Sequence, residues 1–195
     1  TAGGVYVLEM SSFQLDITSD FKPDVAVFLN ISPDHLDRHG DMAGYAHAKG
    51  RIFEIQSTDA KAVISVDDDI SQGFAERYKG RTVPVSVKSV LRDGISVQNG
   101  ILYDHMDEAN IRYDLTRFYT LRGQHNHQNA AAAYATGRLL GLDGDQIITT
   151  FETFPGLEHR QEIVAELDGG KFINDSKGTN PDAAVRALEA FDNVH

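Results

Sequence analysis

The chain has 195 residues, of which 41% are apolar, and a formal net charge of −11 from 18 basic and 29 acidic side chains. This length fits one domain, or one domain and part of a second, and no apolar run approaches the ~20 residues that span a bilayer. The acidic balance argues against nucleic acid or an anionic membrane as a partner, and the lack of cysteine excludes disulfides, thiolate zinc sites and cysteine nucleophiles.

The chain opens on four small residues, Thr1 to Gly4, that lead directly into an apolar run. No charged and apolar leader precedes this run, so we expect no signal peptide and a cytoplasmic protein. The first residue is not methionine, which indicates a chain entered midway.

Strand-like runs alternate with helix-like segments over the first half of the chain. Strands are predicted at 5–9, 25–30, 62–66 and 83–87, and helices at 44–56 and 70–79. The alternation predicts an α/β fold with a largely parallel sheet flanked by helices. Two further runs meet at Asn99-Gly100, which predicts a tight hairpin, and 111–120 adds another strand region. We therefore expect a small antiparallel addition at the edge of the sheet.

An alanine-rich helix is predicted at 127–141, with Asn126 as its N-cap and Gly141 as its stop. A second helix at 143–153 leads to the linker 154–157. Beyond the linker we predict strands at 162–167 and 171–174 and a helix at 181–192. Two strands and one helix are too few for a stable domain. We therefore expect one domain over 1–155, and the start of a second over 156–195.

Polar residues follow the first two predicted strands. Glu9 ends the first, Ser11 and Ser12 come next, and His35 follows the second. Ligands of open α/β sheets bind just past the carboxyl ends of the strands. A carboxylate and an imidazole at that edge suit a divalent metal and the phosphates that accompany it. Ser11 and Ser12 are suited to capping the next helix and leaving its N–H groups free.

Each of these residues also has an ordinary interpretation. An isolated glutamate or histidine is usually a solvated or structurally satisfied group, and Lys49, in the middle of a helix, is by default a solvated lysine. His35 and His39 are spaced i, i+4, which could bind zinc, although Gly40 makes a helix through His39 doubtful.

Three later segments combine amide, imidazole and charged side chains: 123–130, 158–160 and 174–181. Arg160 suits a phosphate, because its guanidinium donates two parallel hydrogen bonds. Asp175, Lys177 and Thr179 are crowded into a strand–helix loop, the usual place for ligand contacts. A capped helix start and a surface ion pair remain adequate alternatives. The chain contains no Gly-x-x-x-x-Gly-Lys-Ser/Thr motif, so any phosphate-binding loop for ATP lies elsewhere.

Taken in order, these segments resemble the Mur ligases of peptidoglycan synthesis. The matching residues are Glu9-Met10-Ser11-Ser12-Phe13-Gln14-Leu15, Asp34-His35-Leu36-Asp37-Arg38, Ala48-Lys49-Gly50-Arg51-Ile52, Gly123-Gln124-His125-Asn126 with Asn129-Ala130, Gly156-Leu157-Glu158-His159-Arg160, and Asn174-Asp175-Ser176-Lys177-Gly178-Thr179-Asn180. Each motif alone is weakly specific, but six in order along nearly the whole chain are strong. The Ser-Ser-Phe-Gln-Leu run is most similar to the member of the family that adds D-glutamate.

The resemblance implies a domain assignment. Mur ligases have a UDP-binding domain, a central ATPase domain and a Rossmann-like C-terminal domain. By this comparison, residues 1–155 look like most of the central domain without its phosphate-binding loop. Residues 156–195 look like the start of the C-terminal domain.

The resemblance also implies roles for single residues. Glu9 is similar to a magnesium-binding glutamate, His35 to a histidine at the second magnesium and the muramoyl substrate, and Lys49 to a carbamylated lysine beside the metal. ATP would be bound by Asn129, Arg160 and Asp175. Muramoyl-substrate contacts fall on Ser11 and Gln14, and acyl-phosphate and D-glutamate contacts on Lys177 and Thr179. The catalytic residues would thus be Lys49, His35 and Lys177, with ATP and two Mg²⁺ ions as cofactors.

The implied activity is that of an ATP-dependent amide ligase. It would join D-glutamate to UDP-N-acetylmuramoyl-L-alanine through an acyl phosphate, in peptidoglycan synthesis and hence in cell-wall biogenesis, cell shape and cell division. We expect a monomer, and expect the 195 residues alone to be inactive. Three alternatives stay open: a non-catalytic nucleotide-binding module, a metal-dependent hydrolase built on Asp34, His35, Asp37 and His39, and a sister ligase with another amino-acid substrate.

Overall fold

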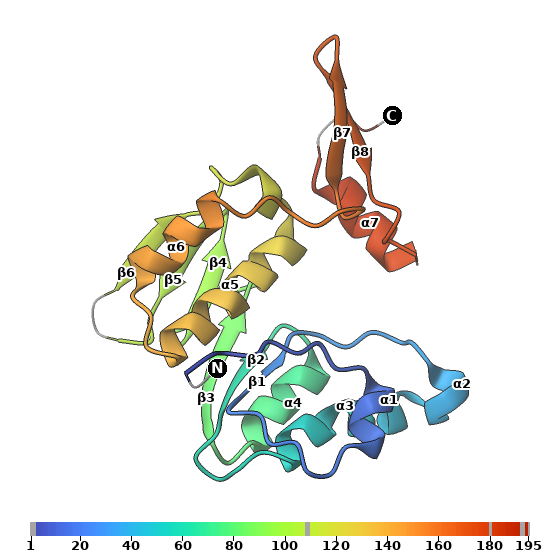
Figure 1. Cartoon of the computed structure of the whole chain (residues 1–195), viewed down its shortest axis with the longest axis vertical. Helices are drawn as coiled ribbons and strands as arrows, with labels where there is room; N and C mark the ends of the chain where they lie inside the picture. Colours follow the sequence, from blue (N-terminus) through green and yellow to red (C-terminus); the bar gives the residue numbers. More distant parts are fainter. Residues whose placement is uncertain (1–2, 108–109, 180, 192–193, 195) are drawn as a thin grey trace.

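The computed structural model describes residues 3–107, 110–179, 181–191 and 194, and its centre is a six-stranded sheet (Figure 1). The strands lie side by side in chain order: β1 (Val25–Phe28), β2 (Lys61–Ser65), β3 (Arg81–Ser86), β4 (Ile95–Gln98), β5 (Ile101–Asp104) and β6 (Ile111–Asp114). Strands β1 to β4 are parallel, and β5 and β6 are added antiparallel. The predicted α/β class, with a mostly parallel sheet and an antiparallel edge, is confirmed.

Helices cover both faces of the sheet. One face is covered by α3 (Met42–Glu54) and α4 (Asp69–Arg77), and the other by α5 (Gln124–Leu139) and α6 (Gly144–Glu152). Two short helices, α1 (Ser12–Ile17) and α2 (Leu36–His39), pack beside α3. No helix in the described residues is both long enough and apolar enough to cross a bilayer.

Strand β2 shows why helices cover both faces of the sheet, because successive side chains of a strand point to opposite faces. Val63 packs in the larger core with α5 and α6. Its neighbours Ala62 and Ile64 pack in the smaller core, against aromatic side chains of α3 and α4. A strand that is buried on both faces reads as a continuous apolar run, as the sequence of β2 does.

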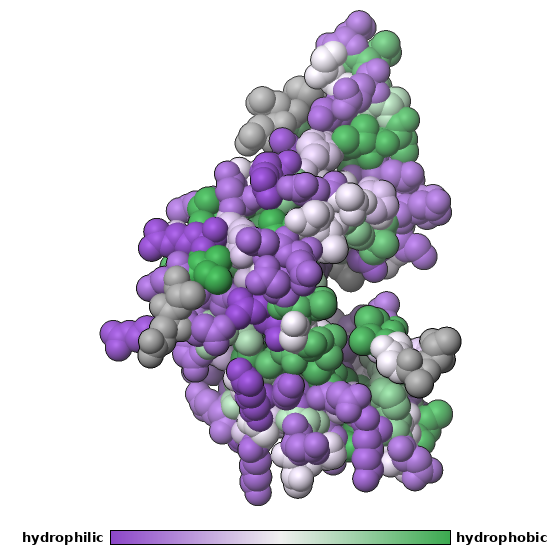
Figure 2. Space-filling model, turned by 60° about the vertical axis from the view of Figure 1, so that its left-hand side comes forward, coloured by the Kyte–Doolittle hydropathy of each residue, from purple (hydrophilic) through white to green (hydrophobic). Residues whose placement is uncertain are grey.

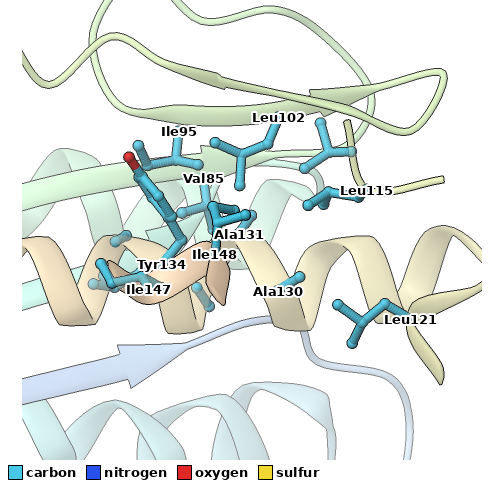
Figure 3. Close-up of a cluster of buried hydrophobic side chains, with 14 of the residues drawn as sticks. Val85, Ile95, Leu102, Leu115, Leu121, Ala130, Ala131, Tyr134, Ile147 and Ile148 are labelled. Atoms are coloured by element: carbon cyan, nitrogen blue, oxygen red, sulfur yellow. The ribbon is translucent and has the colours of Figure 1, made fainter. Parts of the chain in front are cut away.

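The larger core lies between β3–β5 and the helices α5 and α6 (Figure 3). Its largest fully buried side chain is Tyr134, which extends from α5 toward the sheet. Gly144, at the start of α6, allows this packing. A Cβ atom there would lie 2.4 Å from the Tyr134 hydroxyl and 2.6 Å from that of Tyr113. The alanines of α5 likewise let the helix approach the sheet closely.

The hairpin between β4 and β5 forms at the predicted turn. Asn99 and Gly100 both have positive φ angles, 51° and 77°, as a two-residue hairpin turn of the primed type requires. The following strand is shorter than predicted, because β6 ends at Asp114 and a 3₁₀ helix occupies Tyr119–Leu121.

The first predicted strand, 5–9, does not form. Residues 4–10 have no regular structure, and the side chains of Val5, Tyr6, Val7 and Leu8 are 60–92% exposed. A strand exists only with a hydrogen-bonded partner. In the described residues, β1 pairs with β2 along one edge, and no strand occupies its other edge. The run has strand composition, but its backbone is not paired with the free edge of β1.

Helix α5 starts three residues earlier than predicted. Its N-cap is Gly123, with φ +86°, and not Asn126. Asn126 lies in the first turn, where its side-chain amide donates a hydrogen bond to the Arg122 carbonyl. Gly141, with φ +87°, follows the helix as the predicted stop.

The C-terminal part is a hairpin of β7 (Glu162–Leu167) and β8 (Gly170–Asn174), followed by α7 (Pro181–Glu189). Several of its apolar residues are more than half exposed, among them Val164, Leu167, Phe172 and Leu188. Green atoms mark hydrophobic residues on this hairpin at the top of Figure 2. The element order matches the prediction, and the exposed apolar surface fits an incomplete core.

One buried charge stabilises the junction of sheet and helix. The carboxylate of Asp104, on β5, is 2% exposed and accepts hydrogen bonds from the Tyr134 hydroxyl at 2.8 Å and from the Arg138 guanidinium. Arg138 also pairs with the exposed carboxylate of Asp107. Because a buried carboxylate is costly without a partner, this contact fixes α5 against β5.

We predict that Arg138→Met lowers the free energy of unfolding by about 3–5 kcal/mol, because it leaves Asp104 charged and buried without its counterion. The matched control is Arg117→Met, which breaks an ion pair whose two side chains are about half exposed and should cost less than ~1 kcal/mol. Urea denaturation measures both. Equal losses in the two variants would contradict this view of Asp104.

Candidate functional site

The segment after Glu9 forms a short helix with a capping box. The Ser11 side chain accepts a hydrogen bond from the Gln14 backbone N–H, while the Gln14 side chain accepts one from the Ser11 backbone N–H at 2.8 Å. The expected capping is therefore present. Ser11 and Gln14 are both exposed, so their outer faces remain open to solvent.

The loop after β1 brings His35 to the edge of the sheet in an uncommon backbone conformation. His35 has φ 52° and lies at the N-cap of α2. Its backbone N–H donates to the Asp34 carboxylate at 2.8 Å, and its Nε2 atom lies 3.6 Å from the same carboxylate. A non-glycine residue with positive φ marks a position held by its surroundings, as is frequent at binding sites.

Aromatic and imidazole rings join the three helices α1, α2 and α3. The Phe13 ring lies 5.2 Å from the His35 ring and 5.7 Å from the His39 ring, centroid to centroid. Tyr45, on α3, lies 6.2 Å from His35 and 5.4 Å from His39. The Lys49 ammonium lies 5.4 Å from the Tyr45 ring centroid. His35 and Lys49 therefore both contact the Tyr45 ring.

The Lys49 amine is more than half buried, and burial lowers its pKa below the usual 10.5. The carboxylates of Asp34 and Glu9 act in the opposite direction, because each favours the charged amine. Both carboxylates therefore lie close enough to Lys49 to interact with it. The convergence of Glu9 and His35 on Lys49 stays a prediction, and Asp34 acts on Lys49 together with Glu9.

The donor set fits a hard cation better than zinc. Exposed carboxylates at Glu9 and Asp34 supply the oxygen ligands that Mg²⁺ prefers, and a carbamate on Lys49 would supply another. Among the described residues, no three His, Asp or Glu side chains are grouped so that they could hold a metal. The zinc pair fails, because the His39 ring faces Ser12 and Asp16. This finding applies to a magnesium site at these residues as well as to the metal-dependent hydrolase.

A second group forms where α5 meets the segment before β7. Gln161 is its centre: its backbone N–H donates to the Asp175 carboxylate at 3.0 Å, and its side-chain amide lies 3.0 Å from His125 Nε2. Asn126 donates to the Gln161 side chain at 3.5 Å, and Asn129 to Asn126 at 3.5 Å. The predicted nucleotide residues Asn129 and Asp175 are thus linked through two intervening amides. The contacts of Gln161 were not anticipated from sequence.

Arg160 and Asp175 both act on His125. Burial chiefly lowers the pKa of His125; Arg186 and Arg160 lower it further, and Asp175 opposes them. Arg160, Lys177 and Thr179 are exposed, so their charged and hydroxyl groups can meet a ligand. Lys177 is held through its backbone, which donates to the His159 carbonyl at 3.0 Å. Asn180, the last residue of that motif, lies outside the described residues.

Gln128 was also missed from sequence. This side chain of α5 is almost fully buried. It accepts a hydrogen bond from Asn30, at the end of β1, at 2.8 Å, and donates to Ser65, at the end of β2, at 2.9 Å. A weaker contact of 3.4 Å reaches the Asp67 carboxylate. A single amide thereby ties the start of α5 to the carboxyl ends of two strands.

A hollow of about 130 Å³ lies at this edge; His125 of the second group lines it, and none of the predicted site residues does. It is lined by Asn30, Ile31 and Ser32 from the loop that leads to His35, and by His125 and Gln128 from α5. A larger hollow of about 610 Å³ lies near the amino ends of the strands, beside Phe53, Phe74 and Tyr78, and contains none of the predicted site residues. We assign the site to the carboxyl edge, since the charged and polar groups gather there.

The chain matches the family model described as the Mur ligase middle domain over residues 2–137. It is 47% identical to a UDP-N-acetylmuramoylalanine–D-glutamate ligase of Caulobacter sp. strain K31, over 97% of this chain and 41% of that protein. MurF of Acinetobacter baumannii superposes with a TM-score of 0.70 at 22% identity, covering 93% and 40% of the two chains. MurF of Thermotoga maritima, solved in complex with ADP, gives 0.66 at 24% identity, covering 87% and 39%.

The match in length is partial. The chain spans about two fifths of the curated relative and of both solved structures. The two structural matches support the fold, and the sequence match supports the family.

We predict that Asp34→Asn lowers the pKa of Lys49 further, because it removes a carboxylate that favours the charged amine while burial is unchanged. The titration of the Lys49 side chain, followed by NMR on protein labelled at lysine, measures the shift. Asp37→Asn is the control, since Asp37 is exposed nearby on α2 and is not among the groups that act on Lys49. An unchanged or raised pKa in Asp34→Asn would contradict the proposed proximity.

Proposed function

The chain belongs to the Mur ligase family, and we propose that it forms the catalytic centre of an ATP-dependent ligase that adds D-glutamate to UDP-N-acetylmuramoyl-L-alanine. The observation that carries this proposal is the grouping of a half-buried lysine with two carboxylates and His35. The identity of 47% to a D-glutamate ligase supports the choice of substrates. The enzyme would act in peptidoglycan synthesis, and we place it in the cytoplasm as a monomer.

We propose that residues 1–155 are most of the central ATPase domain and that 156–195 open a Rossmann-like C-terminal domain. The family match ends at residue 137, inside α5. The half-exposed apolar face of β7, β8 and α7 is consistent with a domain that continues. The Gly-rich phosphate loop is not among these 195 residues, so the rest of the ATP site would come from elsewhere in the protein.

Lys49 would be a carbamate in the active enzyme. A neutral amine is the form that adds to carbon dioxide, and burial favours that form. The addition converts a cation into an anion with two oxygens, which suits a magnesium site beside Glu9 and His35. Two bound Mg²⁺ ions would neutralise phosphate charge and align the reacting groups.

The nucleotide would lie along the start of α5 and the loops that follow β8. Asn129 and Asp175 would bind the adenosine end, and the exposed guanidinium of Arg160 would bind phosphate oxygens. The ADP complex of the Thermotoga MurF supports the use of an adenine nucleotide in this fold. Lys177 and Thr179 would face the acyl phosphate and D-glutamate.

The reaction needs two steps because a carboxylate is a poor acylating agent. The L-alanyl carboxylate of the muramoyl substrate, positioned by Ser11, Gln14 and His35, would attack the γ-phosphorus of ATP and release ADP. The amine of D-glutamate would then attack the acyl carbon, form the amide and release phosphate. Lys177 would stabilise negative charge on the acyl phosphate.

We propose that the linker 154–157 acts as a hinge between the two domains. Gly156 has φ +83°, a conformation that other residues rarely adopt, and a Thr120 hydroxyl that donates to the Phe154 carbonyl at 3.0 Å holds the start of the linker. Arg160 follows four residues later. Closure of the C-terminal domain would bring Arg160 to the phosphates and exclude the water that hydrolyses an acyl phosphate.

We predict that the full-length protein releases phosphate from ATP only when UDP-N-acetylmuramoyl-L-alanine, D-glutamate and Mg²⁺ are all present. Replacing D-glutamate by L-lysine or diaminopimelate should give background rates. A phosphate-release assay measures all three. Preference for either diamine would refute the assigned specificity, and no release with any of them would refute the ligase.

We predict that Arg160→Ala in the full-length protein slows ligation by about 100-fold or more, as expected when a donor to developing phosphate charge is removed. Arg117→Ala is the matched control, because Arg117 is a half-exposed arginine that pairs with Glu152, before the linker in the chain. The control should keep its rate. An Arg160→Ala enzyme with the wild-type rate would contradict the proposed phosphate contact.

A further inference from the structure

The His39 side chain is only 5% exposed, although none of the residues of the short helix that carries it is buried as a whole. Its Nε2 atom lies 3.0 Å from the Ser12 hydroxyl, and its Nδ1 atom lies 4.0 Å from the Asp16 carboxylate. Ser12 and Asp16 both belong to α1, whereas His39 belongs to α2. The imidazole is therefore a polar link between these two helices.

The same ring also contacts two aromatic rings. The Phe13 ring lies 5.7 Å away and the Tyr45 ring 5.4 Å away, centroid to centroid. Phe13 is on α1 and Tyr45 on α3. His39, on α2, thus contacts both of the other helices of this group, α1 and α3.

The order Ser12, His39, Asp16 is that of a hydrolase triad, but the surroundings do not suit that chemistry. Ser12 is 2% exposed, so a substrate carbonyl cannot reach its hydroxyl. The Ser12 hydroxyl lies within hydrogen-bond distance of Nε2, whereas the Asp16 carboxylate is 4.0 Å from Nδ1. The triad is a structural contact that uses both ring nitrogens.

This contact matters because α1 and α2 cannot hold their own positions. They contain six and four residues, far fewer than an isolated helix needs for stability. Their placement must come from tertiary contacts. Leu15 and Ser12 are buried residues of α1, and the His39 ring makes the polar contact from α2.

We propose that His39 is a positioning residue that sets the separation of Glu9 and Ser11 from His35. Glu9 and Ser11 immediately precede α1, and His35 immediately precedes α2, so a shift between the two helices moves one group away from the other. The inference rests on the proposed function, because it assigns the consequence to binding of the muramoyl substrate at that site. His39 itself does not touch substrate or metal.

The test uses the full-length protein with His39→Phe, which keeps the aromatic packing and removes both polar contacts. Calorimetry without ATP should show binding of UDP-N-acetylmuramoyl-L-alanine weakened about ten-fold, as is typical when a supporting contact behind a ligand group is lost. The KM for ATP should change less than two-fold, since Asn129, Arg160 and Asp175 are untouched. Ser12→Ala should weaken substrate binding in the same direction, and the double variant should lose no more than His39→Phe alone.

His47→Phe is the matched control, because His47 is exposed on α3 and should bind substrate as the wild type does. If Ser12→Ala, or a folded His39→Phe, binds substrate as tightly as the wild type, the inference is wrong. Equal weakening of substrate and ATP together with a lower melting temperature would also overturn it, because His39 would then be only structural. Failure of the wild-type protein to bind the muramoyl substrate would refute the proposed function instead.

Discussion

The carboxyl edge of the parallel strands is the constraint on which the site depends. Parallel strands end at the same side of a sheet, so the loops after β1 and β2 and the start of α5 must meet there. The buried Gln128 amide makes this meeting specific, since it bonds Asn30 on one strand end and Ser65 on the next. A buried amide costs free energy unless its hydrogen-bond partners are present. The Gln128 amide therefore fixes the position of the loop that leads to His35 relative to the helix that carries Asn129.

Within that frame, Lys49 is held between two opposing effects. Burial favours its neutral form, and the nearby carboxylates favour its charged form. The proposed carbamate would replace the cation by an anion, and a bound Mg²⁺ would then offset that charge beside Asp34 and Glu9. Without a metal, Lys49 is a partly buried amine close to carboxylates. With a metal, the same residues would be its ligands, as expected of a site that forms when its cofactor binds.

Sequence reasoning predicted the architecture because its signals are local: period-two and period-3.6 apolar patterns, and an Asn-Gly turn that demands two positive φ angles. It failed for 5–9, where strand formation depends on a neighbour, and for Asn126, because Gly123 starts the helix earlier. For the site, the motifs predicted Glu9, His35 and Lys49. Gln128 was not found, since a glutamine near the start of a helix reads as solvated, and its burial arises from contacts with residues 63 and 98 positions away in the chain.

The most direct test of the account is the position of the metal. A crystal of the full-length protein grown with Mn²⁺ in place of Mg²⁺, with UDP-N-acetylmuramoyl-L-alanine and a non-hydrolysable ATP analogue, would locate the ions by anomalous scattering. We expect both peaks to lie within the cluster of Glu9, His35 and Lys49. Peaks elsewhere at the sheet edge, for example beside Asp67 and Asp68, with those three side chains unligated, would contradict it.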